Sequence, residues 1–534
     1  MPSKFTDMVK LTIDHKPVEV NDGTTIMEAA ACLGIAIPSM CHQPGYPNHP
    51  SCMVCMVKDA DRGQLIPSCS MTATEGMNIL TATDEVREVR REALELLLSD
   101  HVGDCEAPCR LSCPAFMDIP LMNRLIAAGD FEQALRIVRN EIALPLILGY
   151  ICPAPCEKAC KRKPMDQAVS ICHLKRSTAQ YTERYDNGLP AMAERNGKRV
   201  AIIGTGPAGL SAAFYLQKSG YSCTLFDQHE NAGGAMFYDI PADRLPKDIL
   251  EAEITVIRSM GAEFRMDIEI TQELFQSAIA GHFDAVVLAT GTMKPGHAGI
   301  FGLQPDEHGQ FVDKKKMTTS IPGIFACGNI IREQKMAVHA AAQGKMAAQS
   351  VALFLGSKIP ADARPGFNSV VGHLFEPEWQ EYLQEGIPDQ RVEPAGGFPA
   401  GLNRDEAMHE ASRCMHCDCR KPASCKLRLY AGEYGANRKR FAGPHRKRLT
   451  RSLQHELVVY ESEKCIRCGL CVEITQKHGE SIGLSYAGRG FDVRIAVPFG
   501  GTTAGALTTA AGECVAACPT GALTWKNCEE RQSS

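Results

Sequence analysis

The 534-residue sequence has no long apolar run and no excess of charge of one sign. Its first residues, MPSKFTDMVKLTIDHK, lack the apolar core of a signal peptide. No stretch approaches the roughly 20 apolar residues of a membrane-spanning helix. Lys and Arg are interspersed among Asp and Glu, with a formal net charge of -5, unlike the basic footprint of nucleic-acid-binding proteins. We therefore expect a cytoplasmic protein that binds neither membrane nor nucleic acid.

Cysteine, in contrast, is abundant, with 24 residues. The cysteines form groups within residues 1–70, 105–172, 414–425 and 465–518, around a cysteine-poor middle. In a reducing compartment disulfides are disfavoured and thiolates stay free to bind metals. A secreted disulfide scaffold is the alternative, but such scaffolds are short and carry a secretion signal. The cysteines are therefore interpreted as metal or cluster ligands.

The first group follows a predicted strand pair at 9–20 and a helix that starts at a capping box, residues 25–28, and ends near Gly34. Its candidate ligands are Cys41, Cys52, Cys55 and Cys69. Their spacing is that of plant-type 2Fe-2S sites with a shorter first gap. Zinc is the alternative, although zinc sites usually use two close pairs. Cys32 is predicted to be a core thiol on the helix.

The motifs IPSMCHQPG and SCMVCMV resemble the N-terminal ferredoxin domain of the complex I large iron-sulfur subunit and of iron-only hydrogenases. This resemblance implies a β-grasp domain with one 2Fe-2S cluster.

The second group offers eight soft ligands, enough for two 4Fe-4S clusters. They are His101, Cys105, Cys109, Cys113, Cys152, Cys156, Cys160 and Cys172. Residues 118–145 between them have helical periodicity, which predicts a small helical domain. A lone His is more often a surface or satisfied residue, but its place in the run favours ligation. The alternative for Cys172 is a packed thiol.

Two resemblances divide these ligands differently. The stretch from Cys113-Pro114 through ICPAPCEKAC to AVSI resembles the di-cluster domain of the glutamate synthase small chain and dihydropyrimidine dehydrogenase, with His101 where that pattern has a cysteine. It implies one cluster on Cys113, Cys152, Cys156 and Cys160. The His101-x3-Cys105 start resembles the His-ligated cluster of complex I and hydrogenases, which implies a division between Cys113 and Cys152. The partition stays open.

The middle of the chain contains KRVAIIGTGPAGLSAAFYLQKSGYSCTLFDQ, which predicts a strand, a Gly-rich turn, a helix and a second strand. Gly204, Gly206 and Gly209 permit a tight turn and the close approach of a pyrophosphate at the helix N-terminus. Asp227, 18 residues past Gly209, is placed to hold a ribose hydroxyl.

Gly233-Gly234, DAVVLATGT and SIPGIFACGNI then follow in the order of the glutamate synthase small chain and related FAD-dependent oxidoreductases. The resemblance implies FAD. Asn329 stands where this family usually has Asp, and an amide can still bond a ribityl hydroxyl. The predicted FAD contacts are Gly204, Gly206, Pro207, Ala208, Gly209, Asp227, Gly233, Gly234, Thr290, Gly291, Gly328 and Asn329.

In that family a second Rossmann unit, which binds NADPH, is inserted between the ATG and GIFA segments. Here only about thirty residues separate Gly291 from Gly323, as many as a βαβ crossover alone requires. We therefore expect a flavin that does not meet NAD(P)H within its own chain.

Four further cysteines lie within twelve residues: Cys414, Cys417, Cys419 and Cys425. They predict a 4Fe-4S site, with zinc as the alternative. The segments YESEKCIRCGLCVEIT and GECVAACPTGAL resemble the halves of a bacterial two-cluster ferredoxin. This resemblance implies one 4Fe-4S site on Cys465, Cys468, Cys471 and Cys518. The other site is stripped, because Thr475 replaces one ligand and only Cys514 remains of three.

Two basic runs, 438–440 and 446–448, are either a solvated connector or a docking site for an acidic partner face. The predicted chain is a multidomain α+β and α/β protein. Its regions are a 2Fe-2S domain (1–85), a helical domain with two 4Fe-4S clusters (86–190), an FAD-binding domain (196–356), a linker rich in Pro, Gly and Ala (357–403) and a C-terminal ferredoxin-like region (404–534).

A chain with FAD, one 2Fe-2S and four 4Fe-4S clusters predicts an electron-transferring oxidoreductase subunit without its own catalytic residues. The expected partners are a diaphorase-like FMN subunit that uses NAD(P)H and a catalytic formate dehydrogenase or hydrogenase subunit, or ferredoxin in a flavin-based bifurcating complex. The alternatives are a self-contained NAD(P)H-dependent reductase of the glutamate synthase type and a non-enzymatic redox sensor or carrier.

Overall fold

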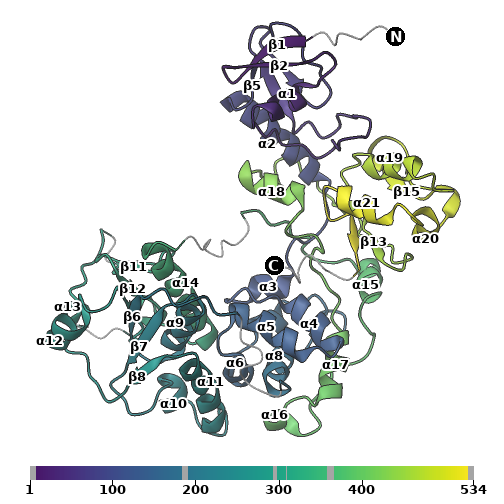
Figure 1. Cartoon of the computed structure of the whole chain (residues 1–534). Coiled ribbons are helices and arrows are strands. Elements are labelled where there is room, and N and C mark those ends of the chain that lie inside the picture. Colours follow the sequence, from purple (N-terminus) through teal and green to yellow (C-terminus); the bar gives the residue numbers. More distant parts are fainter. Residues whose placement is uncertain (1–7, 183–190, 293–296, 308–309, 358–365, 527–534) are drawn as a thin grey trace. The chain divides into compact units, whose positions relative to one another are not determined.

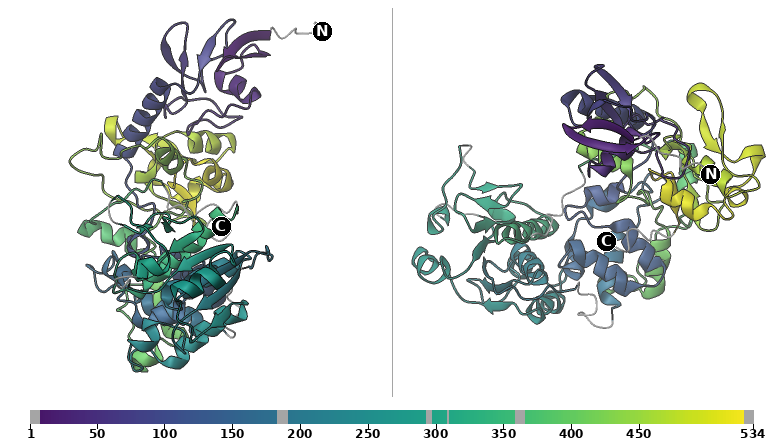
Figure 2. Two further views of the ribbon diagram at one scale, coloured as in Figure 1. Left: turned by 90° about the vertical axis from the view of Figure 1, so that its left-hand side faces the viewer. Right: turned by 45° about the horizontal axis from the view of Figure 1, so that its top comes forward.

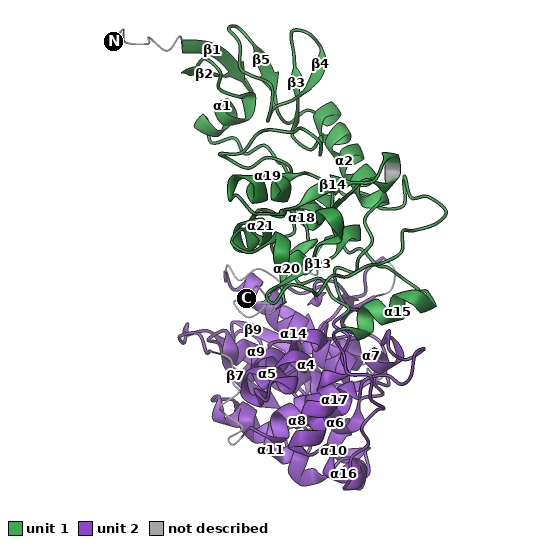
Figure 3. Cartoon of the chain, turned by 90° about the vertical axis from the view of Figure 1, so that its right-hand side faces the viewer, with its two compact units in different colours: residues 1–106, 364–384, 417–534 green, residues 107–363, 385–416 purple. Residues whose placement is uncertain are grey.

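The structure is a computed structural model that describes residues 8–182, 191–292, 297–307, 310–357 and 366–526 (Figure 1). The chain groups into two compact units, coloured separately in Figure 3. Unit 1 consists of residues 1–106, 364–384 and 417–534. Unit 2 consists of residues 107–363 and 385–416.

Unit 1 begins with a five-stranded sheet beside one helix (Figures 1 and 2). The strands, in spatial order, are β2 (Lys16–Asn21), β1 (Met8–Ile13), β5 (Asn78–Leu80), β3 (Met56–Asp59) and β4 (Gln64–Pro67). β1 and β5 are parallel, and the other neighbours are antiparallel. Helix α1 (Ile26–Cys32) begins at the predicted capping box, in which Thr25 accepts from the Glu28 N–H and the Glu28 carboxylate accepts from Thr25 N. The N-terminal region is thus a mixed sheet with one helix, and its assignment as a β-grasp fold stays a prediction.

The remainder of unit 1 is built from short elements. Its helices are α2 (Asp84–Ser99), α15 (Glu376–Leu383), α18 (Lys426–Glu433), α19 (Leu470–Lys477), α20 (Thr503–Ala506) and α21 (Ala511–Ala517). Its antiparallel strand pairs are β13 (Val458–Tyr460) with β16 (Leu523–Trp525), and β14 (Ser485–Ala487) with β15 (Arg494–Ala496).

Unit 2 begins with a helical region, as the sequence predicts. Its helices are α3 (Pro108–Ser112), α4 (Ile119–Ala127), α5 (Phe131–Glu141), α6 (Pro145–Ile151), α7 (Pro155–Lys158), α8 (Ile171–Gln180), α16 (Gly397–Ala400) and α17 (Arg404–Ser412). The core of this region is apolar and continuous with the helical face of the neighbouring sheet.

The second part of unit 2 is a seven-stranded sheet. The strands, in spatial order, are β10 (Val312–Asp313), β11 (Thr318–Thr319), β12 (Ile324–Ala326), β9 (Ala285–Leu288), β6 (Arg199–Ile203), β7 (Ser222–Phe226) and β8 (Glu263–Arg265). The five strands from β12 to β8 are parallel. The helices of this part are α9 (Pro207–Lys218), α10 (Ala235–Tyr238), α11 (Lys247–Ser259), α12 (Gln272–Leu274), α13 (His297–Ile300) and α14 (Ala337–Phe354). This arrangement is a Rossmann-type dinucleotide fold.

Helices α9 and α14 pack closely because α14 contributes a glycine at their contact. A Cβ atom on Gly344 would lie 2.2 Å from the carbonyl oxygen of Ala208. Between Gly291 and Gly323, the described residues form only α13 and the two short strands β10 and β11, while 293–296 and 308–309 lie outside the described ranges.

The compact units divide the chain at other residues than the predicted domains, whose boundaries stay a prediction. Residues 86–106 group with unit 1, and α17 packs against α4 and α8 in unit 2. Leu402, Ala407 and Ala411 are fully buried in that helical core. Chain order alone does not show which core an amphipathic helix joins.

The predicted linker at 357–403 is also different in the structure. Residues 358–365 lie outside the described ranges, as do 1–7, 183–190 and 527–534 of the flanking domains. Within 366–384, Val371, Leu374 and Tyr382 are buried, so this segment is part of the core of unit 1. None of the helices in the described ranges combines the length and the apolar character needed to cross a membrane.

Candidate iron-sulfur and dinucleotide sites

Four cysteines of the N-terminal sheet domain converge in one buried spot. They are Cys41, Cys52, Cys55 and Cys69. The Sγ atoms of Cys41 and Cys52 lie 3.4 Å apart, and the Cys69 thiol interacts with both Cys41 and Cys55. Hydrogen bonds from the Cys52 and Cys69 thiols lower the pKa of Cys41, which favours the thiolate that binds metals. All four predicted ligands are thus close together.

Cys32 is not the core thiol that the sequence suggests. It is exposed at the end of α1, because the buried face of that helix consists of Ile26, Ala29 and Ala30. The prediction placed Cys32 on the wrong side of a short helix.

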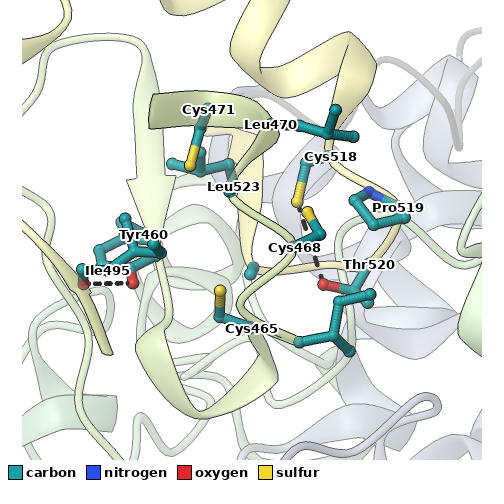
Figure 4. Close-up of a pocket in the computed structure, with 13 residues that line it drawn as sticks. Tyr460, Cys465, Cys468, Leu470, Cys471, Ile495, Cys518, Pro519, Thr520 and Leu523 are labelled. Atoms are coloured by element: carbon teal, nitrogen blue, oxygen red, sulfur yellow. Dashed lines mark hydrogen bonds between the residues drawn. The ribbon is translucent and has the colours of Figure 1, made fainter. Parts of the chain in front are cut away.

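The second sulfur site in unit 1 is the pocket of Figure 4. Cys465, Cys468, Cys471 and Cys518 line it. Gly469, with a φ of 81°, turns the chain into α19 so that Cys468 and Cys471 face the same pocket, and Cys518 enters from the end of α21. The N–H of Arg467 donates to Cys465 Sγ at 3.3 Å. The structure therefore gathers the four residues that the ferredoxin resemblance implies.

The residues of the stripped second ferredoxin site are part of the protein core. Thr475 donates its hydroxyl to Val472 O and accepts from Leu484 N at 3.1 Å. Cys514 is buried among apolar side chains that include Ile474 and Val515.

A third sulfur group lies in the helical region of unit 2. It consists of Cys113, Cys152, Cys156 and Cys172. The Cys172 thiol, on the first turn of α8, interacts with both Cys152 and Cys156. The division of the predicted ligands between two clusters stays open.

Lys175 lies beside this third group and was missed from the sequence. Its side chain is 3% exposed, one turn after Cys172 on α8. Burial lowers its pKa, but the charges of Cys172, Cys152, Cys156 and Cys113 outweigh burial and raise it. A buried cation needs a negative partner, and here the cysteines supply it. No sequence motif marks Lys175, because only the fold brings the four sulfurs around it.

The four-cysteine run 414–425 spans the boundary between the two compact units. Cys414 belongs to unit 2, where it is buried, interacts with Asn123 and lies within electrostatic range of Cys160. Cys109 packs, half-buried, against the same helical core. Across the described ranges, no three His, Cys, Asp or Glu side chains are spaced as ligands of a single metal ion.

The other three residues of that run belong to unit 1. Cys419 and Cys425 are within electrostatic range of Cys105. The charge of Cys417 instead affects the buried side chains of Tyr382 and Arg451. The boundary between the compact units falls after residue 416, and the single site expected on residues 414–425 stays a prediction.

The Gly-rich turn of the Rossmann domain has the predicted geometry. Gly204 has a φ of 107°, and a Cβ there would lie 2.3 Å from Ala289 O. A Cβ on Gly209 would lie 2.0 Å from Gly204 O, so both positions require glycine. Gly206 has open space where a Cβ would stand, at the start of α9. This empty cradle at a helix N-terminus fits a pyrophosphate. Pro207 and Ala208 begin that helix.

Asp227 already has local partners at the end of β7. One carboxylate oxygen accepts from Thr205 N at 2.8 Å and from Thr205 Oγ1 at 2.7 Å. The other accepts from the His229 N–H at 3.1 Å. Asp227 thus braces the Gly-rich turn, and its contact with a ribose stays a prediction.

Five further predicted contacts are Gly233, Gly234, Thr290, Gly291 and Gly328. A Cβ on Gly234 would lie 3.0 Å from the Gly206 Cα, and one on Gly328 would lie 3.0 Å from the Ala208 Cβ. Gly233 precedes this contact with a φ of 122°, and Gly291 follows Thr290 with a φ of 77°. The Thr290 Oγ1 is buried without a hydrogen-bond partner among the described residues.

Asn329 accepts from Gln334 N at 3.1 Å, beside the Gly328 N–H, which donates to Gln343. The unpartnered Thr290 hydroxyl and the open space at Gly206 fit a bound dinucleotide, which would supply a hydrogen-bond partner for that hydroxyl.

The two basic runs are not a free docking patch. Arg440 pairs with Glu95 at 2.9 Å, and Arg446 makes two bonds to the buried Glu378 at 2.5 and 2.6 Å. Lys447 pairs with Asp100 at 2.8 Å. Three of the six basic side chains are therefore paired with carboxylates within unit 1.

Three family models match parts of this chain. Residues 6–84 match the family described as a 2Fe-2S iron-sulfur cluster binding domain. Residues 84–187 match dihydropyrimidine dehydrogenase domain II, 4Fe-4S cluster. Residues 202–259 match an NAD(P)-binding Rossmann-like domain. The chain thus contains a 2Fe-2S domain, a 4Fe-4S domain and a Rossmann-like dinucleotide domain.

The chain is homologous over part of its length to oxidoreductase subunits. It is 35% identical to the NADPH-Fe(3+) oxidoreductase subunit beta of Geobacter sulfurreducens, over 45% of this chain and 38% of that protein. It is 35% identical to the NADP(+)-dependent formate dehydrogenase subunit beta of Moorella thermoacetica, over 39% of this chain and 32% of that protein. The glutamate synthase [NADPH] small chain of Bacillus subtilis is 37% identical, over 34% of this chain and 37% of that protein.

The chain therefore spans less than two fifths of the length of these relatives. Among solved structures, an NAD+-reducing [NiFe]-hydrogenase aligns with 97% of this chain and 88% of its own, at 12% identity and a TM-score of 0.35.

Proposed function

We propose that this chain is an electron-transferring iron-sulfur flavoprotein subunit of a multisubunit oxidoreductase. It would hold one 2Fe-2S cluster, four 4Fe-4S clusters and FAD. When bound, the clusters exchange single electrons and the flavin exchanges one or two. The protein positions these groups, covers them from water and tunes their potentials through nearby charges and hydrogen bonds.

The observation that carries this proposal is the continuity of the sulfur sites within unit 1. Cys41 and Cys52 share one apolar cluster of buried residues with Cys468 and Cys425. The charge of Cys41 acts on Cys468, and that of Cys518 acts on Cys425. Three sulfur sites are therefore neighbours in one core, as stepwise electron transfer requires.

The Rossmann domain supports FAD as the bound dinucleotide. Besides the Gly-rich turn that all such folds use, residues 323–330 return to α9, where Gly328 packs against Ala208. This second contact follows the order of the FAD-dependent relatives. The described residues between 291 and 323 contribute one short helix and two short strands, which leaves no visible second dinucleotide fold there.

The proposal includes two partners. The 2Fe-2S end suits a diaphorase-like FMN subunit that oxidises NAD(P)H, and the other end suits a catalytic dehydrogenase or hydrogenase subunit or a ferredoxin. Two of the similar proteins are themselves called beta subunits. Anaerobic co-purification from the native host tests both partners.

The central experiment uses the full chain purified alone without oxygen. We expect flavin that is released as FAD, iron that matches five clusters, bleaching by dithionite and no bleaching by NADH or NADPH. A chain that binds neither iron nor flavin overturns the proposal.

A self-contained NADPH reductase is the second candidate. It is favoured by the match of residues 202–259 to an NAD(P)-binding family and by the similarity to the glutamate synthase small chain. Rapid bleaching of the isolated flavin by NADPH would select this function over the relay.

A further inference from the structure

The three cysteines at 105, 419 and 425 form a sulfur group that no local motif contains. Cys105 follows the segment after α2, whereas Cys419 and Cys425 precede α18. The N–H of Cys419 donates to Cys105 O at 3.2 Å and ties the two segments together. All three side chains are at most 7% exposed.

The three thiols act on one another electrostatically. After burial, the charge of Cys419 is the next cause that raises the pKa of both Cys105 and Cys425. Cys105 also acts on Cys425. Three buried cysteines from two joined segments are the kind of ligand set that a metal centre uses.

The surroundings of this group are those of ligand sulfurs. The N–H of Ser369 donates to Cys105 Sγ at 3.3 Å. The Lys464 ammonium acts on Cys419, and a Cβ on Gly521 would lie 2.4 Å from Cys419 Sγ. Only glycine allows this approach, which holds the sulfur in place. Backbone donors and cations near the sulfurs are what stabilises and tunes iron-sulfur sites.

A fourth donor stands four residues before Cys105. The His101 Nδ1 atom is buried and has no hydrogen-bond partner among the described residues. The ring bonds instead to the backbone of Lys464, the residue whose side chain reaches Cys419. A ligating His characteristically uses one ring nitrogen for the backbone and keeps the other for the metal.

We propose that Cys105, Cys419 and Cys425 hold one 4Fe-4S cluster, with His101 as the fourth ligand. This inference rests on the proposed function and changes which cysteines share a cluster. The site joins two sequence groups that are more than 300 residues apart. The charge of Cys518, which lines the pocket of Figure 4, acts on Cys425. Cys414 is left to a different site in unit 2, with Cys160.

The test compares single cysteine-to-serine variants of the full chain, purified without oxygen. Electron paramagnetic resonance and iron content are measured after dithionite reduction. C105S, C419S and C425S are each expected to lose the same one signal and about four irons per chain. C160S and C414S should both lose a different signal. C223S, in the Rossmann core, is the matched control and should lose none.

The failures of this inference and of the proposed function are distinguishable. The shared site is wrong if C105S removes the same signal as C109S and C113S, while C419S and C425S remove another signal. The proposed electron-transfer function is then unaffected. If the unaltered chain binds no iron, the proposed electron-transfer function is itself wrong. The 2Fe-2S signal, which comes from the same unit, is measured on every variant and identifies any in which unit 1 does not fold. G521A then replaces C419S, because crowding Cys419 should alter the same signal.

His101 is tested separately with H101C. We expect the cluster to remain and only the signal lost in C105S to change its g-values. An unchanged signal, or loss of that signal in C417S, overturns the assignment of His101.

Discussion

If the sulfur group of Cys113, Cys152, Cys156 and Cys172 holds a cluster, Lys175 is predicted to raise the reduction potential of that cluster. Its ammonium is 3% exposed, and the charges that act on it most come from those four cysteines. Adding an electron makes such a site more negative, so a fixed cation favours the reduced form. Replacing Lys175 with Met keeps the length of the side chain and removes the charge, so the potential should fall.

The size of the shift follows from Coulomb's law. At an effective dielectric constant of about 20, unit charges roughly 4 to 8 Å apart interact by about 2 to 4 kcal/mol. For a one-electron couple this corresponds to a shift on the order of 100 mV. Burial of Lys175 keeps water and salt from screening the interaction.

A redox titration followed by electron paramagnetic resonance measures this shift. K175R should retain most of the potential. K158M is the matched control, since Lys158 is exposed on α7, close to Cys156 in sequence. A change in K175M no larger than that in K158M would refute the reasoning, because it would show that the buried charge is not coupled to the cluster.

Three other predictions concern the flavin and the stability of the two units. G206A should keep the fold and the iron but lose most of the FAD, because its Cβ enters the open cradle; G299A, at an exposed glycine with free space, should keep the flavin. R446A should cost about 3 to 5 kcal/mol in the unfolding of unit 1, because it leaves the buried Glu378 carboxylate unpaired, and adding E378Q should restore much of this. Burial raises the pKa of Glu253 from 4.5 to about 7. The protonated side chain therefore stabilises the fold below pH 4.5, and this contribution is lost as the pH rises through 7. Denaturant titrations should show that E253Q removes about 3 kcal/mol of this pH dependence.

The predicted site residues that the structure brings together are mainly those that are close along the chain. The Gly-rich turn from Gly204 to Gly209 is one example, because its geometry depends on backbone conformation and on side-chain size at a few positions. The 2Fe-2S loop from Cys41 to Cys55 and the ferredoxin run from Cys465 to Cys471 are others. In each, a short spacing fixes how the sulfurs or glycines can meet.

The internal pairing of the basic runs could not be predicted in the same way. Arg446 has no acidic residue beside it in sequence, yet it bonds to Glu378 of a segment that resembles a linker. Composition indicates the charge of a segment, whereas the packing of α15 decides what neutralises that charge.

By itself, the sequence determines that this chain has cysteine-rich cluster domains around a dinucleotide fold, because spacing and turn chemistry are local properties. Only the tertiary structure decides that Cys172 joins Cys113, that Cys105 joins Cys419 and that Lys175 lies among four sulfurs. These groupings depend on which helices share a core. That choice is made by the burial of apolar faces far apart in the chain, and spacing between cysteines carries no record of it.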